Sequence, residues 1–430
     1  MHAQDSFIKN SPLARPDFRF FLGGRFFAAL AMQMQSVAIG WYLYDLTRDP
    51  LTLGYAALAV FMPIVLLTLP AGDIADRRDR RHILGAAHAV QSVCAALLVY
   101  LVMAKTVETW PFYSVLALSG AARAFSGPAQ QSFTPFLVPR EEFGHAVAWS
   151  TSSSQIAMVL GPALGGLIYL IGPWAPFGAC LVVSPLVAAA MLSIGVRICG
   201  TPSDSSALKR VVAGLAYLRR QPVVLGAITL DLFAVLLGSV TALLPVYARD
   251  ILHAGPDGLG VMRSSIAVGA VGMGLLLANL PAARHPHAGR AMFGGVAVFG
   301  AAALVFGVST HYVLSIAALA VMGAADMISV YVRSTVVQLG TPDDMRGRVS
   351  AVHMLFVGVA NEFGDFRAGL FAAWLGAVPA VMAGGVCTLA VVALWTRFFP
   401  ALRWIDRLSE VGARPLRDRP PPGPARQDAP

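Results

Sequence analysis

Nine charged side chains lie inside long apolar stretches of this sequence of 430 residues. A charge at the centre of a lipid bilayer costs roughly 2.5–3.5 kcal/mol, so such residues pair with one another or face a water-filled cavity. In a cavity, arginines can bind anionic groups and acids can carry protons. The nine residues are Arg25, Arg123, Asp231, Arg263, Asp326, Arg333, Glu362, Asp365 and Arg367.

The four acids are the candidates for proton binding. Glu362 and Asp365 are three residues apart, so they share one face of a helix, where their repulsion favours the binding of a proton. Asp231 and Asp326 are candidates for a proton carrier or for a counter-charge. Three of the arginines have a second interpretation, because near a helix end they could extend to the membrane surface: Arg263, Arg333 and Arg367.

The composition predicts that these residues are held in a membrane. Hydrophobic residues make up 57% of the chain and charged residues only 13%, against about 25% charged in soluble domains. The net charge of +9 is not a nucleic-acid signal, because most basic residues lie between apolar runs. We therefore expect the lipid bilayer as a partner and no nucleic acid.

Runs of about 20 mostly apolar residues, the length that crosses a bilayer, occur twelve times. The runs are continuous rather than alternating, which favours helices over barrel strands. The predicted fold class is an all-α membrane protein with twelve transmembrane helices in two pseudo-symmetric six-helix halves. The predicted spans are about 18–44, 51–71, 82–104, 110–131, 144–171, 174–196, 222–248, 257–281, 290–309, 311–337, 349–376 and 378–399.

The distribution of basic residues predicts the orientation. With a cytoplasmic N-terminus, 24 lysines and arginines fall in cytoplasmic segments, and only Arg48, Lys105 and Arg249 fall in outside loops. Cytoplasmic loops of membrane proteins carry this excess of positive charge. Both termini are therefore expected in the cytoplasm of a multi-pass protein of the cell inner membrane.

The longest internal polar segment divides the chain. We expect a cytoplasmic segment at 1–17, an N-terminal half at 18–196, a linker at 197–221, a C-terminal half at 222–399 and a disordered cytoplasmic tail at 400–430. The linker contains a basic amphipathic helix from Ala207 to Arg220, which should lie on the cytoplasmic face. Similar segments begin at Pro139 and Pro342, which indicates a parallel repeat of the two halves.

The loop after span two reads Gly72-Asp-Ile-Ala-Asp76-Arg-Arg-Asp-Arg80-Arg81-His-Ile-Leu. It resembles the signature of the major facilitator superfamily, G-x-L-A-D-R-x-G-R-R/K-x-x-L, with isoleucine for the first leucine and aspartate for the second glycine. The resemblance implies a cytoplasmic gate in which Asp76 and Arg80 bridge to the opposite half in one state. The same arginines would also suit a simple cytoplasmic loop. The gate candidates are Gly72, Asp76, Arg77, Arg80 and Arg81.

Span five contains a second element, Gly161-Pro162-Ala-Leu-Gly165-Gly166. It resembles the G-P-x-x-G-G element of facilitator exporters and antiporters, and its glycines also allow close helix packing. Arg123 and the glycine four residues later resemble the superfamily's R-x-x-x-G element in span four, whose arginine is linked to proton transfer.

Almost the whole chain, about 15–410, resembles the enterobactin-exporter branch of the major facilitator superfamily. The resemblance rests on Gly40-Trp-Tyr-Leu-Tyr-Asp-Leu-Thr, Leu243-Leu-Pro-Val-Tyr-Ala and Thr341-Pro-Asp-Asp-Met-Arg-Gly-Arg-Val-Ser-Ala. That branch also contains multidrug and macrolide pumps.

The resemblance implies a secondary active exporter, a proton-coupled antiporter of a siderophore or a drug-like compound that works by alternating access. We expect a small-molecule substrate, a monomer, and no cofactor beyond the proton gradient as energy source. Uptake of a small polar solute and a non-transporting membrane sensor are the alternatives. An enzyme is not expected, because the sequence has no spaced metal ligands, nucleophile motif or phosphate loop.

Overall fold

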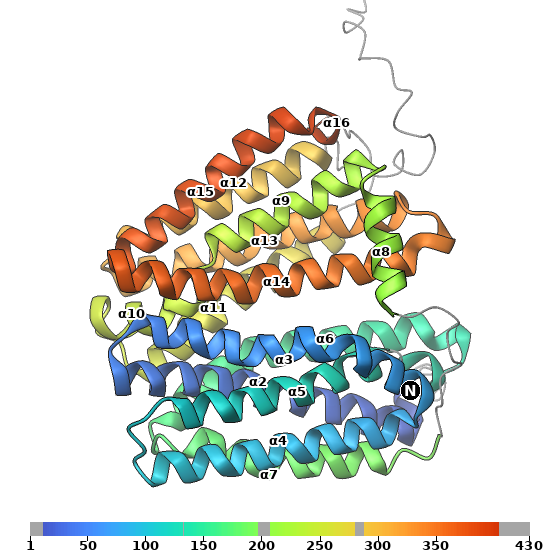
Figure 1. The fold of residues 1–430 in the computed structure, drawn as a ribbon, viewed down its shortest axis with the longest axis horizontal. Helices are drawn as coiled ribbons and strands as arrows, with labels where there is room; N and C mark the ends of the chain where they lie inside the picture. Colours follow the sequence, from blue (N-terminus) through green and yellow to red (C-terminus); the bar gives the residue numbers. More distant parts are fainter. Residues whose placement is uncertain (1–11, 132, 197–206, 280–287, 404–430) are drawn as a thin grey trace, which may run out of the picture.

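The computed structural model describes residues 12–131, 133–196, 207–279 and 288–403, and nearly all of them are helical. The first six long helices are α2 (Pro16–Thr47), α3 (Pro50–Arg77), α4 (Arg80–Met103), α5 (Trp110–Gln131), α6 (Phe143–Tyr169) and α7 (Ala175–Leu192). The second set comprises α9 (Pro222–Gly238), α11 (Pro256–Asn279), α12 (Ala288–Val308), α13 (Tyr312–Leu339), α14 (Asp343–Leu375) and α15 (Ala377–Phe398). The two sets lie side by side, with their helices running in roughly the same direction (Figure 1).

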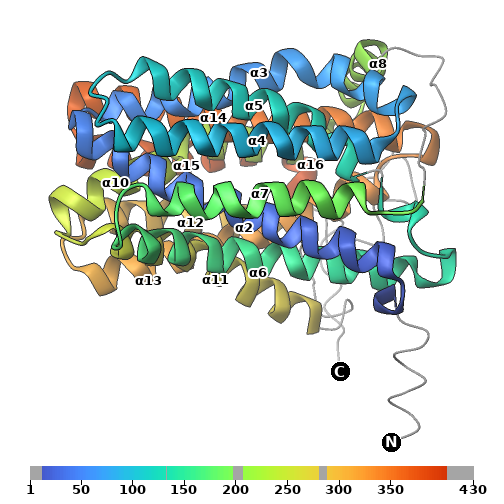
Figure 2. The same ribbon diagram turned by 90° about the horizontal axis from the view of Figure 1, so that it is seen from below.

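Short elements precede, join and follow these helices. They are η1 (Pro12–Ala14), η2 (Thr134–Phe136), η3 (Arg140–Glu142), α8 (Ala207–Leu218), η4 (Thr241–Leu243), α10 (Leu244–Val246), the π-helix η5 (Tyr247–Ile251) and α16 (Pro400–Arg403). Helix α8 lies at one end of the bundle (Figures 1 and 2) and packs on α14. The amphipathic helix predicted from Ala207 is therefore present, ending at Leu218.

Local sequence fixes several helix starts. Proline occupies the first turn of α2, α3 and α9, where its missing N–H has no helical partner to lose. The Asp49 side chain caps α3 by accepting a hydrogen bond from the Leu51 N–H at 2.9 Å. The two repeat segments correspond in structure as well, because Pro139 directly precedes η3 and α6, and Pro342 directly precedes α14.

The predicted all-helical membrane fold is confirmed. In the described part of the chain, nine helical segments are long and apolar enough to cross a membrane. Helices α5, α6 and α14 fall outside that set, yet they run alongside the others (Figure 1) and are more polar along their length. The charges of α14 (Glu362, Asp365 and Arg367) illustrate why a simple hydropathy criterion misses such a helix.

Two details of the predicted spans were wrong. Span seven was expected to be one helix over 222–248, but α9 ends at Gly238 and helical structure resumes only at Thr241. Spans two and eleven were placed too short at one end, since α3 continues to Arg77 and α14 begins already at Asp343. Charged residues extend these two helices beyond the apolar runs, so the apolar length did not reveal their ends.

The two six-helix sets meet along α6 with α11 and along α3 with α14. The α6–α11 contact is close because glycine leaves no side chain between the backbones: a Cβ added to Gly166 would lie 2.3 Å from the Pro256 carbonyl oxygen. On α11, a Cβ added to Gly260 would lie 2.5 Å from the Pro162 carbonyl oxygen. Small residues permit this kind of backbone approach between membrane helices.

Candidate functional site

We define two faces of the bundle by their connections. The Arg48 face carries the links after α2, α4, α6, η5, α12 and α14. The Arg78 face carries the C-terminal ends of α3, α5, α7, α8 and α13. The charged residues of the predicted cavity lie on helices between these two faces.

A central cluster of charges joins the two six-helix sets. Arg263 on α11 donates from Nη1 to the Ser36 hydroxyl oxygen on α2 at 2.6 Å. Glu362 on α14 lies within electrostatic reach of Arg263 and also of Arg123 on α5. Arg123, Glu362 and Asp365, predicted from the sequence, are therefore brought to one region, together with the unpredicted Ser36.

Asp365 and Arg367 bind the broken span seven. The Ser239 hydroxyl donates a hydrogen bond to the Asp365 carboxylate, and Arg367 donates from Nε to the Leu236 carbonyl oxygen at 2.9 Å. Arg367 also lies over the Phe371 ring, 5.3 Å from its centroid. Its charge is therefore held inside the bundle.

A second charged group is contained in the C-terminal set. Asp231 on α9 and Arg333 on α13 form an ion pair whose side chains are 8% and 5% exposed. The interpretation that Arg263, Arg333 and Arg367 extend to the membrane surface is therefore wrong, because each has a partner within the protein.

The remaining two predicted cavity charges stand apart from the central cluster. Arg25 on α2 donates from Nε to the Ser154 hydroxyl on α6 at 3.1 Å. Asp326 on α13 is partly buried, and within the described residues it has no ion-pair partner.

The predicted gate residues begin at the end of α3. Arg77 pairs with Asp73 one turn earlier at 3.2 Å, and both side chains are well exposed. Arg80 is buried, with its guanidinium 5.4 Å from the centroid of the Phe136 ring. Gly72 lies in α3 with open space around its Cα, and the side chain of Asp76 lies outside the described set.

Arg81 holds this turn to the end of α7. It donates to the Ile194 carbonyl oxygen at 2.6 Å and pairs with the Asp79 carboxylate at 2.7 Å. Asp79 also caps α4 by accepting from the Arg81 N–H at 3.1 Å. Burial acts to raise the pKa of Asp79, but the hydrogen bonds and charge of Arg81 outweigh it and hold this pKa below its ordinary value.

The glycine element of α6 packs against helices of both sets. Gly161 and Gly165 face α2, where an added Cβ would meet Gln33 and the Met34 backbone. Gly166 and the Pro162 carbonyl face α11 of the other set. The glycines of this element therefore allow the close helix packing that was expected of them.

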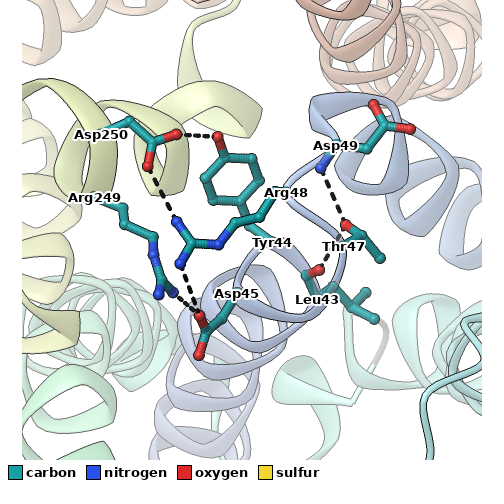
Figure 3. A network of polar contacts seen from close by, with 8 residues as sticks. All are labelled: Leu43, Tyr44, Asp45, Thr47, Arg48, Asp49, Arg249 and Asp250. Carbon is teal, nitrogen blue, oxygen red and sulfur yellow. Dashed lines mark hydrogen bonds and ion pairs between the residues drawn. The ribbon is translucent and has the colours of Figure 1, made fainter.

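An ion-pair network closes the Arg48 face between the two sets (Figure 3). Asp45 at the end of α2 pairs with Arg249 of η5, and the Tyr44 hydroxyl donates to Asp250. Arg48 lies between the two acids, 3.4 Å from Asp250 and 3.8 Å from Asp45. We call these five residues the Arg48 network.

Sequence reasoning missed the Arg48 network, since Arg48 and Arg249 were counted only as outside-loop charges. An available signal was the pairing of an acid with an arginine at both places, Asp45 with Arg48 and Arg249 with Asp250. Arg48 takes a left-handed conformation with φ 55° where α2 ends, and this turns its side chain back between the two acids.

The geometry defines a class of protein: a helical membrane transporter with two six-helix sets, charges buried between them and one face closed by ion pairs. Residues 8–416 match the model of the family described as "Transmembrane secretion effector". The chain belongs to this family of major facilitator transporters and is not an enzyme, and the resemblance drawn from its motifs is confirmed.

Two curated relatives are efflux proteins. Macrolide efflux protein A of Streptococcus pyogenes is 26% identical over 265 residues, which cover 59% of this chain and 64% of the relative, so the match spans less than two thirds of that protein. The enterobactin exporter EntS of Shigella boydii is 23% identical over 389 residues, covering 88% of this chain and 89% of the relative.

A solved structure shares the fold. The bacterial homologue of the human lysosomal transporter Spinster, in an inward-facing and occupied conformation, superposes with a TM-score of 0.67 at 14% identity, covering 90% of this chain and 97% of that one. At this identity the likeness concerns the fold alone.

Proposed function

We propose that this protein exports an amphipathic organic compound in exchange for protons, by alternating access between the halves 18–196 and 222–399. The central cluster is the observation that carries the proposal. It puts Glu362 of one half near Arg123 of the other, at an interface that alternating access must rearrange. A carboxyl group that changes partners between two states can bind a proton in one and release it in the other.

The proposed roles follow from position. Glu362 and Asp365 exchange the proton, with Asp231 and Asp326 as further acids in the path. Arg25 and Arg123 attract anionic groups of the cargo. The Gly161–Gly166 element keeps the backbone of α6 close to α2 and α11, so that α6 can rotate against them between the two states.

We place the Arg78 face in the cytoplasm and the Arg48 face outside, in the inner membrane, because of the excess of basic residues at the first. In this orientation Gly72, Asp76, Arg77, Arg80 and Arg81 form the cytoplasmic gate, and the described conformation is closed on the outside by the Arg48 network. We propose a monomer as the working unit.

The cargo class is proposed from the relatives. One relative is named for macrolide efflux and another for enterobactin export, and both are large molecules with polar and apolar parts. A drug-like compound or a siderophore is therefore the proposed cargo.

Transport into inside-out membrane vesicles tests the proposal. Labelled erythromycin, a macrolide, and enterobactin are offered to vesicles energised with an acidic interior. We expect one of them to accumulate, and accumulation to stop when an ionophore collapses the pH gradient and with Glu362→Gln. Accumulation that survives the loss of the gradient would refute proton coupling. In inside-out vesicles, accumulation corresponds to export from the cell. Net movement of the compound out of the vesicles would therefore refute export.

A further inference from the structure

Span seven is interrupted where it passes the central cluster. Helix α9 ends with the Ser239 N–H bonded to the Val235 carbonyl oxygen at 2.9 Å, and Ser239 then takes an extended ψ of 130°. Helical structure resumes at Thr241. Broken membrane helices need partners for their freed backbone groups, because no water is available in the hydrocarbon region.

Helix α14 supplies a partner of the suitable sign to each end of the break. Arg367 donates to the Leu236 carbonyl at the end of α9, where the helix dipole is negative. Asp365 accepts from the Ser239 hydroxyl and from the Ala242 N–H at the start of η4, where the dipole is positive. The closely spaced charges of span eleven therefore act as caps for span seven.

The segment after the break leads directly to the Arg48 network. It consists of η4, α10 and η5, three consecutive helical stretches over Thr241–Ile251. Leu243, Leu244 and Tyr247 are fully buried in it, and the Tyr247 hydroxyl donates to the Gly307 carbonyl at 3.0 Å. Its last turn carries Arg249 and Asp250. Tightly packed segments have low compressibility and transmit strain, so this segment connects the break to the Arg48 network.

We propose that Asp365 controls the outside gate through this segment. As a carboxylate, Asp365 caps Thr241–Ile251 and holds Arg249 and Asp250 against α2. As a neutral acid it loses most of its attraction for the Ala242 N–H and the Ser239 hydroxyl, so the segment can shift and the Arg48 network can open. Ser239 is a positioning residue in this link, because it acts through Asp365.

Other charged groups also face Asp365. Arg263 reaches it from α11, and Glu362 and Arg367 act on it from its own helix. The two arginines attract the Asp365 carboxylate, and the carboxyl group of Glu362, one turn earlier, repels it when both are charged. The inference rests on the proposed function only in naming the proton as the natural neutralising agent.

Distances across the Arg48 face test the link without any transport assay. Spin labels are attached at Val107→Cys, in the connection after α4, and at Thr310→Cys, in the connection after α12, because both positions are exposed on that face. The native cysteines are replaced by serine, and double electron–electron resonance is recorded in nanodiscs. Asp45→Asn, which breaks the Arg48 network directly, supplies the reference for the open face.

Three variants decide the outcome. Asp365→Asn, which mimics the neutral acid, and Ser239→Ala, which removes one capping bond, are both expected to raise the long-distance population at least threefold. Ser265→Ala is the matched control for Ser239→Ala, since it removes a buried hydroxyl of α11 that donates within its own helix, to the Met262 carbonyl oxygen at 2.7 Å, and it should leave the distribution unchanged. If Asp365→Asn does not fold, Ser239→Ala decides.

An unchanged distribution in Ser239→Ala and Asp365→Asn would overturn the link, as would an equal shift in Ser265→Ala. These results are independent of the coupling ion. If the distances shift as expected while vesicle transport ignores the pH gradient, the link stands and the proposed proton coupling fails.

Discussion

The Arg48 network should set the balance between the outside-closed and outside-open states. Asp45→Asn removes the ion pairs of Asp45 with Arg249 and with Arg48 while keeping the size of the side chain. Because the side chains of Asp45, Arg249 and Arg48 are 43%, 24% and 54% exposed, solvent screens both pairs. Exposed pairs contribute about 0.2–1 kcal/mol each.

The two pairs together should therefore contribute roughly 1 kcal/mol, which corresponds to about a fivefold change in the ratio of the two states. Labels at Val107→Cys and Thr310→Cys report this ratio as the long-distance fraction. We expect the fraction to rise about fivefold in Asp45→Asn. In high salt the wild type should approach the variant, because ionic screening shortens the reach of exposed charges.

A control variant and a second substitution make the test strict. Asp73→Asn removes an exposed pair with Arg77 within one helix at the other face, so it should leave the distribution unchanged. Arg249→Gln combined with Asp45→Asn should shift the ratio little more than Asp45→Asn alone, since Asp45→Asn already removes the pair with Arg249. If Asp45→Asn leaves the long-distance fraction as in the wild type, the network does not hold the gate closed.

Three further outcomes concern stability, measured as the melting temperature in detergent. Gly166→Ala should destabilise by about 1–3 kcal/mol, because the added methyl group overpacks the α6–α11 contact. Arg333→Met should cost about 3–5 kcal/mol by leaving Asp231 buried and unpaired, and Asp231→Leu added to it should restore most of the loss. Asp79→Asn should make the melting temperature depend less on pH in the acid range. Because the pKa of Asp79 is lowered in the folded protein, the stabilisation by its carboxylate is complete above about pH 4 and is lost as the pH falls through the folded-state pKa.

Each of these outcomes has a contrary result. Gly294→Ala, at a position with open space around it, should not destabilise, and an equal loss there would point to a general effect of added methyl groups. A double variant at Asp231 and Arg333 that is no more stable than Arg333→Met would deny the unpaired charge as the cause. An Asp79→Asn profile parallel to that of the wild type would contradict the role of the carboxylate.

Much of the fold was predictable because the membrane imposes local rules. Continuous apolar runs must be helices when no water can satisfy the backbone, and their spacing predicts six helices on each side of a polar linker. Prolines and Asp49 mark helix starts through contacts with their own neighbours. The motifs likewise identified the family, because a short loop and a glycine element are local patterns.

The sequence also identified which charges must be buried, since each intramembrane charge stands out against its run. It did not determine their partners. Arg333 and Arg263 had two open interpretations, and only the folded chain brings Asp231 and Ser36 next to them. Pairing between distant segments depends on how helices pack, which one helix by itself does not specify.

Tertiary structure decided which groups stabilise the break in span seven and which residues meet on the Arg48 face. The run over 222–248 contains the Gly238-Ser239 pair and Pro245, which permit a break there, but the partners of the interrupted segment come from another helix. On the neighbouring helix α14, Arg367 binds the Leu236 carbonyl oxygen and Asp365 binds the Ser239 hydroxyl. The sequence determined that charges would lie between the helices, and the packing of the two halves decided which of them meet, because electrostatic partners are chosen by proximity in space.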